Sequence, residues 1–175
     1  MDYLSKFDIP FVSLPFGVHR YEYEIDDKFF EYFENAAIQK GKVHVNLDID
    51  RQETMLILDF EFKGTFEMEC DRCLEKFDFI VDDTHNLIIK LAGETDGEPD
   101  DDVITISNSE QSIHVAKHLY DFLSLLIPYR KVHPDNEEGE STCNPEFLKK
   151  IEGLSHHEEN HNDPRWEALK KLKKK

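Results

Sequence analysis

Two cysteines separated by two residues, Cys70 and Cys73, are the part of this sequence whose residue types and spacing most clearly permit chemistry. Two thiolates at this spacing supply half of a tetrahedral zinc site. The other half would come from His133 and Cys143, which lie far along the chain but can meet the pair in space. These four residues are candidate zinc ligands, and a pair of unliganded thiols is the alternative interpretation.

A redox or regulatory role for the Cys70/Cys73 pair is a further alternative. A thioredoxin-like pair occupies a strand-to-helix turn that activates one thiol, whereas this pair falls between two predicted strands. The segment from His157 to His161 formally reads His-Glu-x-x-His, but it lies in a polar stretch without the apolar helix that a metalloprotease motif requires. The sequence shows no nucleophile–base constellation and no glycine-rich phosphate loop, so we predict that the protein is not an enzyme.

The composition is that of an acidic, polar protein. The chain has 175 residues, of which 39% are hydrophobic and 34% charged, and its net charge is −17. Such a charge favours solubility and repels bare nucleic acid. The sequence has three cysteines, no basic-then-apolar leader and no apolar run long enough to cross a membrane. These features predict a cytoplasmic protein with reduced or metal-bound cysteines and no membrane partner.

Positive charge is concentrated in two short segments that are candidates for contact with RNA or another partner. The first contains Arg130 and Lys131, next to His133. The second is C-terminal and combines an aromatic side chain that can stack on a base with a series of cations: Arg165, Trp166, Lys170, Lys171, Lys173, Lys174 and Lys175. A solubilising helix end that complements the helix dipole would equally explain the lysines of this second segment, and the residues alone leave both interpretations open.

A long β-hairpin is expected to position the cysteine pair. Apolar side chains alternate with polar ones over residues 56–70 and again over 77–91, which is typical of two half-buried strands. A two-residue connection at Asp71-Arg72 would place Cys70 opposite Cys73, with both thiols on one face of the hairpin.

Two residues within this hairpin carry separate expectations. Gly64 interrupts the first strand and predicts a bend or bulge that lets so long a strand curl. His85 falls on the inward register of the second strand, where we expect a structural histidine whose ring nitrogens are hydrogen-bonded.

The remaining pattern predicts an α+β fold. A curled antiparallel sheet, partly open and barrel-like, would contain the hairpin and pack against one or two helices. We assign residues 1–134 to this core domain, with an acidic loop at 93–102, and residues 135–175 to a C-terminal extension with two short helices and a basic end. The other expected elements are strands over 21–25, 42–50 and 103–106, a helix from Asp26 or Asp27 through Gln39, a core helix with Ile113 to Ile127 after a capping box at Ser107 to Glu110, and short helices from Asn144-Pro145 to Gly153 and from Asp163-Pro164 onward.

The hairpin tip also carries a resemblance. Cys70-Asp71-Arg72-Cys73-Leu74-Glu75, after a hydrophobic strand, is similar to the Cys-x-x-Cys-Leu element of the YceD-type family, the large ribosomal RNA subunit accumulation proteins. An acidic loop after the next strand, a helix ending at Pro128 and a closing segment over 163–172 extend the resemblance from Gly41 to the C-terminus. Many members have a second cysteine cluster with a Gly-Leu-Cys core after that proline, whereas this chain has Tyr129 to Thr142 and then Cys143 alone.

The resemblance implies a ribosome-assembly factor without a known catalytic activity. Members of the family are implicated in the accumulation or processing of large-subunit (23S) ribosomal RNA, and their genes often lie beside one for a large-subunit ribosomal protein. The implied partners are large-subunit rRNA or a pre-ribosomal particle, and a basic large-subunit ribosomal protein. On this hypothesis the basic C-terminal segment contacts RNA while the acidic body binds the basic protein.

Overall fold

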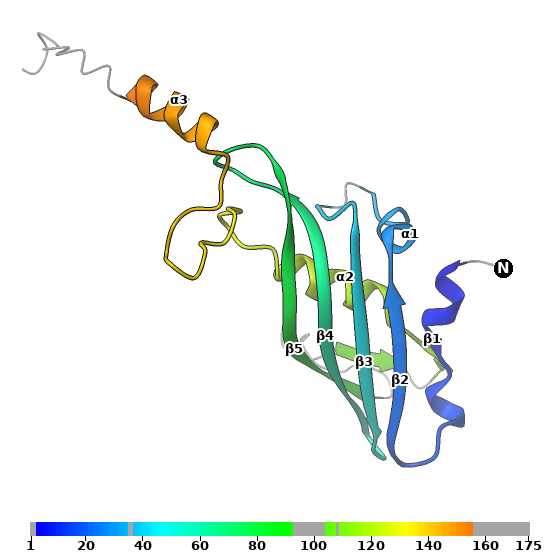
Figure 1. The fold of residues 1–175 in the computed structure, drawn as a ribbon. Helices are drawn as coiled ribbons and strands as arrows, with labels where there is room; N and C mark the ends of the chain where they lie inside the picture. Colours follow the sequence, from blue (N-terminus) through cyan, green and yellow to red (C-terminus); the bar gives the residue numbers. More distant parts are fainter. Residues whose placement is uncertain (1–2, 35–36, 93–103, 108, 156–175) are drawn as a thin grey trace, which may run out of the picture.

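The structure, a computed structural model, describes residues 3–34, 37–92, 104–107 and 109–155, and its centre is a five-stranded sheet in the order β2-β3-β4-β5-β6 (Figure 1). Strands β2 to β5 pair antiparallel with their neighbours, and β6 pairs parallel with the end of β5. The strands of this sheet are β2 (Gly17–Ile25), β3 (Gly41–Arg51), β4 (Met55–Glu69), β5 (Lys76–Ala92) and β6 (Ile104–Ser107).

The remaining elements are short and lie around this sheet. A two-stranded sheet pairs β1 (Asp8–Ile9) with β7 (Ile113–His114). Together with the five-stranded sheet, these elements confirm the predicted α+β class, with a sheet that is partly curled and not closed into a barrel. The helical segments are η1 (Tyr3–Phe7), η2 (Phe11–Ser13), α1 (Asp27–Phe30), α2 (Ala116–Leu125) and α3 (Pro145–Ser155).

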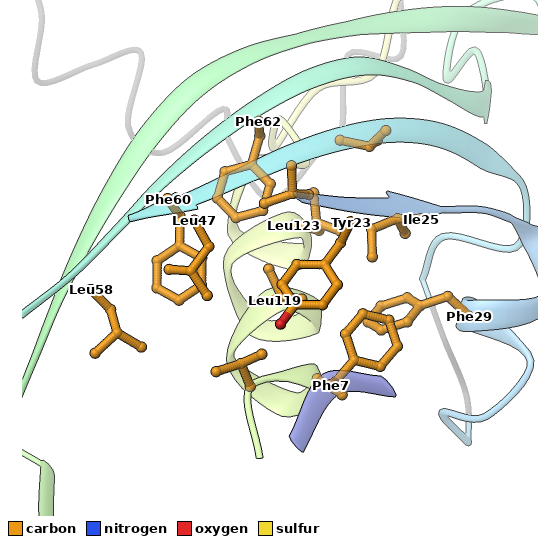
Figure 2. Close-up of a cluster of buried hydrophobic side chains, with 14 of the residues drawn as sticks. Phe7, Tyr23, Ile25, Phe29, Leu47, Leu58, Phe60, Phe62, Leu119 and Leu123 are labelled. Carbon is orange, nitrogen blue, oxygen red and sulfur yellow. The ribbon is translucent and has the colours of Figure 1, made fainter. Parts of the chain in front are cut away.

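One face of the sheet forms the hydrophobic core because apolar side chains occupy alternate positions on every long strand. Helix α2 and the N-terminal segment cover this inner face, and Leu119 and Leu123 of α2 and Phe7 of η1 are fully buried against it (Figure 2). Fully buried aromatic rings come from the strands as well, including Phe60 and Phe62 of β4. The core is therefore independent of the cysteines, which form a separate buried cluster.

The outer face of the sheet is polar and rich in carboxylates. Arg20 binds both carboxylate oxygens of Asp48 on the neighbouring strand, at 2.7 and 2.6 Å. Asn46 likewise donates a hydrogen bond of 3.0 Å to Glu61. An antiparallel sheet with one packed and one solvated face produces this alternation, and the outer face is consequently available to partners.

The hairpin predicted from the alternation is present, but its register differs from the predicted one. Phe66 lies opposite Phe79 and Glu69 opposite Lys76, so the strands are offset by two residues from a pairing of Cys70 with Cys73. The prediction of a two-residue turn at Asp71-Arg72 was therefore wrong. A wider turn spans Cys70 to Glu75, with Leu74 in the left-handed region at a φ of 60°. An offset of two keeps every side chain on its predicted face.

Gly64 causes no bulge, contrary to the prediction. It pairs in unbroken register with Val43 of β3 and Val81 of β5. A Cβ atom at this position would lie 2.0 Å from the carbonyl oxygen of Lys42. The glycine is therefore required by a close approach of two strand backbones.

Two predicted helices are shorter than expected. The helix expected through Gln39 ends after one turn, at Phe30, because its aromatic side chains enter the core and Gly41 already begins β3. The core helix begins at Ala116 and not soon after the Ser107–Glu110 segment, since Ile113 pairs as a strand with Ile9. Helix α3 confirms the short helix expected after Asn144, whereas the acidic loop at 93–102 and the helix expected from Asp163 lie outside the described residues.

His85 lies on the inner side, as predicted. Its ring stacks on that of Phe122 from α2, with centroids 4.8 Å apart and an interplanar angle of 4°. Its Nε2 atom is buried without a hydrogen-bond partner among the described residues, so the expected full hydrogen bonding of this ring is not present. No helix in the described part of the chain is long and apolar enough to span a membrane.

Candidate metal centre

The tip of the hairpin extends beyond the rest of the sheet. The pairing of β3 with β4 ends where Gly41 meets Phe66, so residues 67–78 form a two-stranded arm (Figure 1). An isolated two-stranded hairpin is marginally stable in water. The arm therefore needs an anchor at its tip, and the cysteine cluster lies there.

The structure brings together the four predicted ligands at this tip. One ligand atom from each of Cys70, Cys73, His133 and Cys143 lies within 4.8 Å of all the others. All three cysteines are buried, with exposed fractions of 0 to 3%, and the histidine is half-buried. The hairpin turn thus meets His133 and Cys143, which follow 60 or more positions later, in one small, largely enclosed site.

Three of the six distances between the ligand atoms of this cluster match those around a tetrahedral metal ion. Zinc bonds of about 2.3 Å to sulfur and about 2.0 Å to nitrogen would place two sulfurs about 3.8 Å apart, and a sulfur and a nitrogen about 3.5 Å apart. The Sγ atoms of Cys70 and Cys143 are 3.7 Å apart, and His133 Nδ1 lies 3.4 Å from the Sγ of Cys73 and 3.6 Å from that of Cys143. A disulfide would need about 2.05 Å, and the three cysteines are free thiols.

The turn aims backbone N–H groups at sulfur, which favours the thiolate that a metal requires. Arg72 donates its N–H to the Sγ of Cys70 at 3.4 Å. Burial by itself raises the pKa of the Cys70 thiol, but hydrogen bonds from the N–H groups of Cys73 and Arg72 and from His133 outweigh burial and lower this pKa to about 6. Burial raises the pKa of Cys73, and its thiol neighbours Cys70 and Cys143 raise it further.

Hydrogen bonds outside the ligand set hold the segment 131–133 against the turn. The N–H of Asp71 donates to the carbonyl of Lys131 at 2.7 Å, and the N–H of Lys131 donates to the Asp71 carboxylate at 2.7 Å. The ring of His133 packs on Phe77 of β5, with centroids 4.8 Å apart. These contacts fix the position and orientation of the histidine without involving a metal.

A second set of contacts holds the segment 141–148. Arg72 donates to the hydroxyl of Ser141 at 2.9 Å. Asn144 caps α3 by accepting the N–H of Glu146 at 2.9 Å, and its amide donates to Glu75 in the turn at 2.6 Å. Partly buried apolar side chains complete the enclosure around the cysteines: Phe77, Val132, Phe147 and Leu148.

These supporting roles are not predictable from the sequence. The sequence pattern predicts Asp71 and Arg72 only as turn residues and Asn144 only as the start of a helix. Their roles depend on contacts made 60 or more positions away, since Arg72 bonds Ser141 and Asn144 bonds Glu75. The one local signal is the Asn144-Pro145 pair, which is typical of a capped helix start.

The basic candidates are placed only in part. Arg130 is exposed and follows the fully exposed Tyr129, whereas Lys131 is half-buried beside Asp71, with Nζ 3.8 Å from the carboxylate. The C-terminal candidates, from Arg165 to Lys175, and the His157–His161 motif lie outside the described residues.

A known protein family matches this chain. The profile described as "Large ribosomal RNA subunit accumulation protein YceD" matches residues 58–173, which include all four clustered residues. The chain belongs to the YceD family. The predicted resemblance is thereby confirmed, and the YceD name connects this chain with accumulation of large-subunit ribosomal RNA. No curated protein and no solved structure gives a significant match to the chain.

Proposed function

We propose that the chain is a non-catalytic assembly factor that promotes the accumulation or processing of large-subunit (23S) ribosomal RNA in the cytoplasm. The observation that carries this proposal is the YceD match over residues 58–173, which covers most of the hairpin, the cluster and the basic C-terminal segment as far as Lys173. The described part of the chain supports this proposal with a sheet whose outer face is polar and a hairpin tip that is hydrogen-bonded to the segments 131–133 and 141–148.

Zinc is proposed as the structural cofactor of this module. Three thiols and one imidazole form a donor set that zinc prefers, and they lie at distances that a tetrahedral ion can join. When bound, the ion would link the arm, the 131–133 segment and the start of α3. Cys70, Cys73, His133 and Cys143 would hold it, and the surrounding hydrogen bonds would orient them.

The distribution of charge separates two kinds of contact. Arg130 and Lys131 near the tip, and the cations and Trp166 of the C-terminal segment, are the proposed contacts with rRNA or a pre-ribosomal particle. The acidic body, which gives the chain its net charge of −17, is proposed to hold a basic large-subunit ribosomal protein.

A redox or regulatory role of the Cys70/Cys73 pair is the rival function. A reactive pair needs access for its oxidant or substrate, whereas Cys70 is fully buried and Cys73 is 3% exposed. Both thiols are also engaged with His133 and Cys143. This arrangement favours a structural role for the pair.

Sedimentation of cell lysate through a sucrose gradient tests the proposed function. We expect the intact chain to migrate with large-subunit precursors at low salt, and a chain without Arg165 to Lys175 to shift to the top fractions. About 200 mM salt should weaken the association strongly, because each phosphate contact releases counterions. A variant carrying Lys28→Gln and Lys90→Gln, two exposed lysines of the sheet domain, is the control and should sediment like the parent. An intact chain that stays at the top at low salt would contradict stable ribosomal association.

A further inference from the structure

The outer edge of β5 is unpaired over much of its length among the described residues. Strand β5 pairs with β4 from Lys76 to Lys90 but with β6 only from Ile89 to Ala92. Residues 76–88 therefore present one side of their backbone to no other described strand (Figure 1). Such an edge is a template for an added strand unless it is guarded.

Two hydrogen bonds establish which backbone groups face this edge. The N–H of Cys70 donates to the carbonyl of Glu75 at 2.9 Å, and the N–H of Leu91 donates to the carbonyl of Thr54 at 2.8 Å. Both bonds use odd-numbered residues on the β5 side of the ladder. Because antiparallel ladders alternate, the even-numbered residues of β5 direct their N–H and C=O groups away from β4.

The end of this edge at Thr84 is blocked by a neighbouring side chain. The carboxylate of Asp83 accepts the outward N–H of Thr84 at 2.7 Å. The accessible stretch is consequently Lys76 to Asp82, whose outward groups belong to Lys76, Asp78, Ile80 and Asp82. This length matches a short added strand of five to seven residues.

The side chains of this stretch have a distinct chemistry on each face. On the outer face Asp78 lies opposite Glu67, whose carboxylate already binds Lys76 at 2.7 Å. Two directly opposed carboxylates are unfavourable, and Asp78 makes no ion pair with any described residue. Asp82 lies opposite Lys63, whose ammonium group is bonded to Glu61. Asp78 therefore has no ion-pair partner among the described residues, and Asp82 shares the charge of Lys63 with Glu61.

On the inner face the same stretch is apolar. Val81 is buried, whereas Phe77 and Phe79 remain only half-buried. The ring of Phe77 packs at a tilt against His133 of the candidate metal centre, and that of Phe79 stacks on Phe66 with ring centroids 6.4 Å apart. A strand added beside β5 would cover the uncovered sides of these rings.

We propose that the β5 edge from Lys76 to Asp82 binds an extended, lysine- or arginine-rich polypeptide segment by strand addition. Residues directly opposed across a ladder share a face. The bound segment would therefore place cations opposite Asp78 and Asp82 and apolar side chains opposite Phe79 and Val81. Its five central residues would read cation, apolar, any residue, apolar, cation, a pattern that is the same for parallel and antiparallel pairing.

Charge argues against a second copy of this chain as the occupant. Antiparallel self-pairing centred on Ile80 would place Asp78 of one copy opposite Asp82 of the other, and both copies carry a net charge of −17. The same carboxylates that repel this chain attract a basic one. This proposal rests on the proposed function for the biological identity of the segment, which would be part of a basic ribosomal protein.

A synthetic peptide with Lys-Val-Thr-Val-Lys at its centre, flanked by glycines, is the probe for titration against the full, metal-loaded chain. We expect saturable binding with exchange protection confined to residues 76–82, and binding at least about tenfold weaker after Lys→Glu substitution in the peptide. The same loss is expected for Asp78→Asn with Asp82→Asn. The matched control is Glu22→Gln with Glu24→Gln, two exposed carboxylates of β2, which lies three strands away from β5 in the sheet, and it should leave binding unchanged.

Backbone pairing is tested by two peptides that are N-methylated at alternating positions. Only every second N–H of an added strand faces its neighbour, so one peptide should lose binding while the other retains it. Retention by both would overturn strand addition. In the protein, Ile80→Pro should abolish binding because it removes an outward N–H without breaking the β4 ladder, whereas Ile80→Thr should bind like the parent.

Other occupants of the edge give different results. Protection of 76–82 in the free, monomeric chain would show that another segment of this chain covers the edge, and would overturn the proposal. Concentration-dependent dimerisation that Ile80→Pro abolishes would also overturn it in favour of a second copy. A chain that fails to bind the peptide but migrates with large-subunit precursors would refute only the proposal that the β5 edge binds a strand. Peptide binding without that migration would refute the proposed function alone.

Discussion

Replacement of Cys143 by serine is expected to abolish metal binding and to release the hairpin arm and α3 together. The Sγ atom of Cys143 lies 3.7 Å from that of Cys70 and 3.6 Å from His133 Nδ1, so its loss opens one corner of the tetrahedron. A serine hydroxyl remains protonated at neutral pH and is a poor zinc ligand. We expect about one zinc per parent chain and less than about a tenth of that in the variant.

The structural consequence of this substitution should be local. The cluster is separate from the main core, so strands β2 to β4 should keep their slow hydrogen exchange. Residues 67–78 and 145–155 should exchange at least about a hundredfold faster, because local opening there no longer breaks metal bonds. Thr142→Val is the control, since it removes only one exposed hydrogen bond, to the carbonyl of Pro134. Full metal content in the Cys143→Ser protein would refute the four-ligand site.

Substitution of Gly64 by alanine is expected to be the most damaging change in the sheet. The added Cβ would meet the carbonyl oxygen of Lys42 at 2.0 Å and the Cα of Val43 at 2.6 Å. Both are backbone atoms of β3, so the strands would have to separate to admit it. We expect a loss of at least about 3 kcal/mol in the free energy of unfolding, at the upper end for overpacking.

Gly153 in α3 provides the matched comparison for this prediction. A Cβ at Gly153 would meet nothing within 4 Å, and alanine in a helix is favoured over glycine by about 0.5–1 kcal/mol. Gly153→Ala should therefore unfold in urea like the parent or at slightly higher denaturant. A Gly64→Ala protein within about 1 kcal/mol of the parent would show that β3 and β4 can separate at little cost.

Local sequence pattern anticipated the parts of this fold that depend on local alternation. The hairpin strands and their buried faces follow from a period of two, which survives an offset of two residues. The turn could not be predicted, because its shape depends on Leu74 at positive φ and on Asp71 bonding to Lys131. The short α1 and the strand at Ile113 likewise reflect tertiary pairing and burial that overrode helical spacing.

In the candidate site, too, one part is predictable from the sequence and another depends on tertiary structure. Residue type identified all three cysteines of the sequence, Cys70, Cys73 and Cys143, as candidate zinc ligands, with His133 as the fourth. Their convergence depends on the path of the chain after Pro128, which no local period encodes. The edge of β5 was also not predictable, since a strand does not reveal from its own sequence whether a neighbour will cover it.

The ratio of mature 23S to 16S rRNA in cells that lack this chain tests the central claim most directly. We expect the ratio to fall on loss of the chain and to recover when the intact chain is supplied. The Thr142→Val chain should restore the ratio fully, and the Cys143→Ser chain should restore it only in part. An unchanged ratio in cells without the chain, at normal growth, would contradict a role in large-subunit rRNA accumulation.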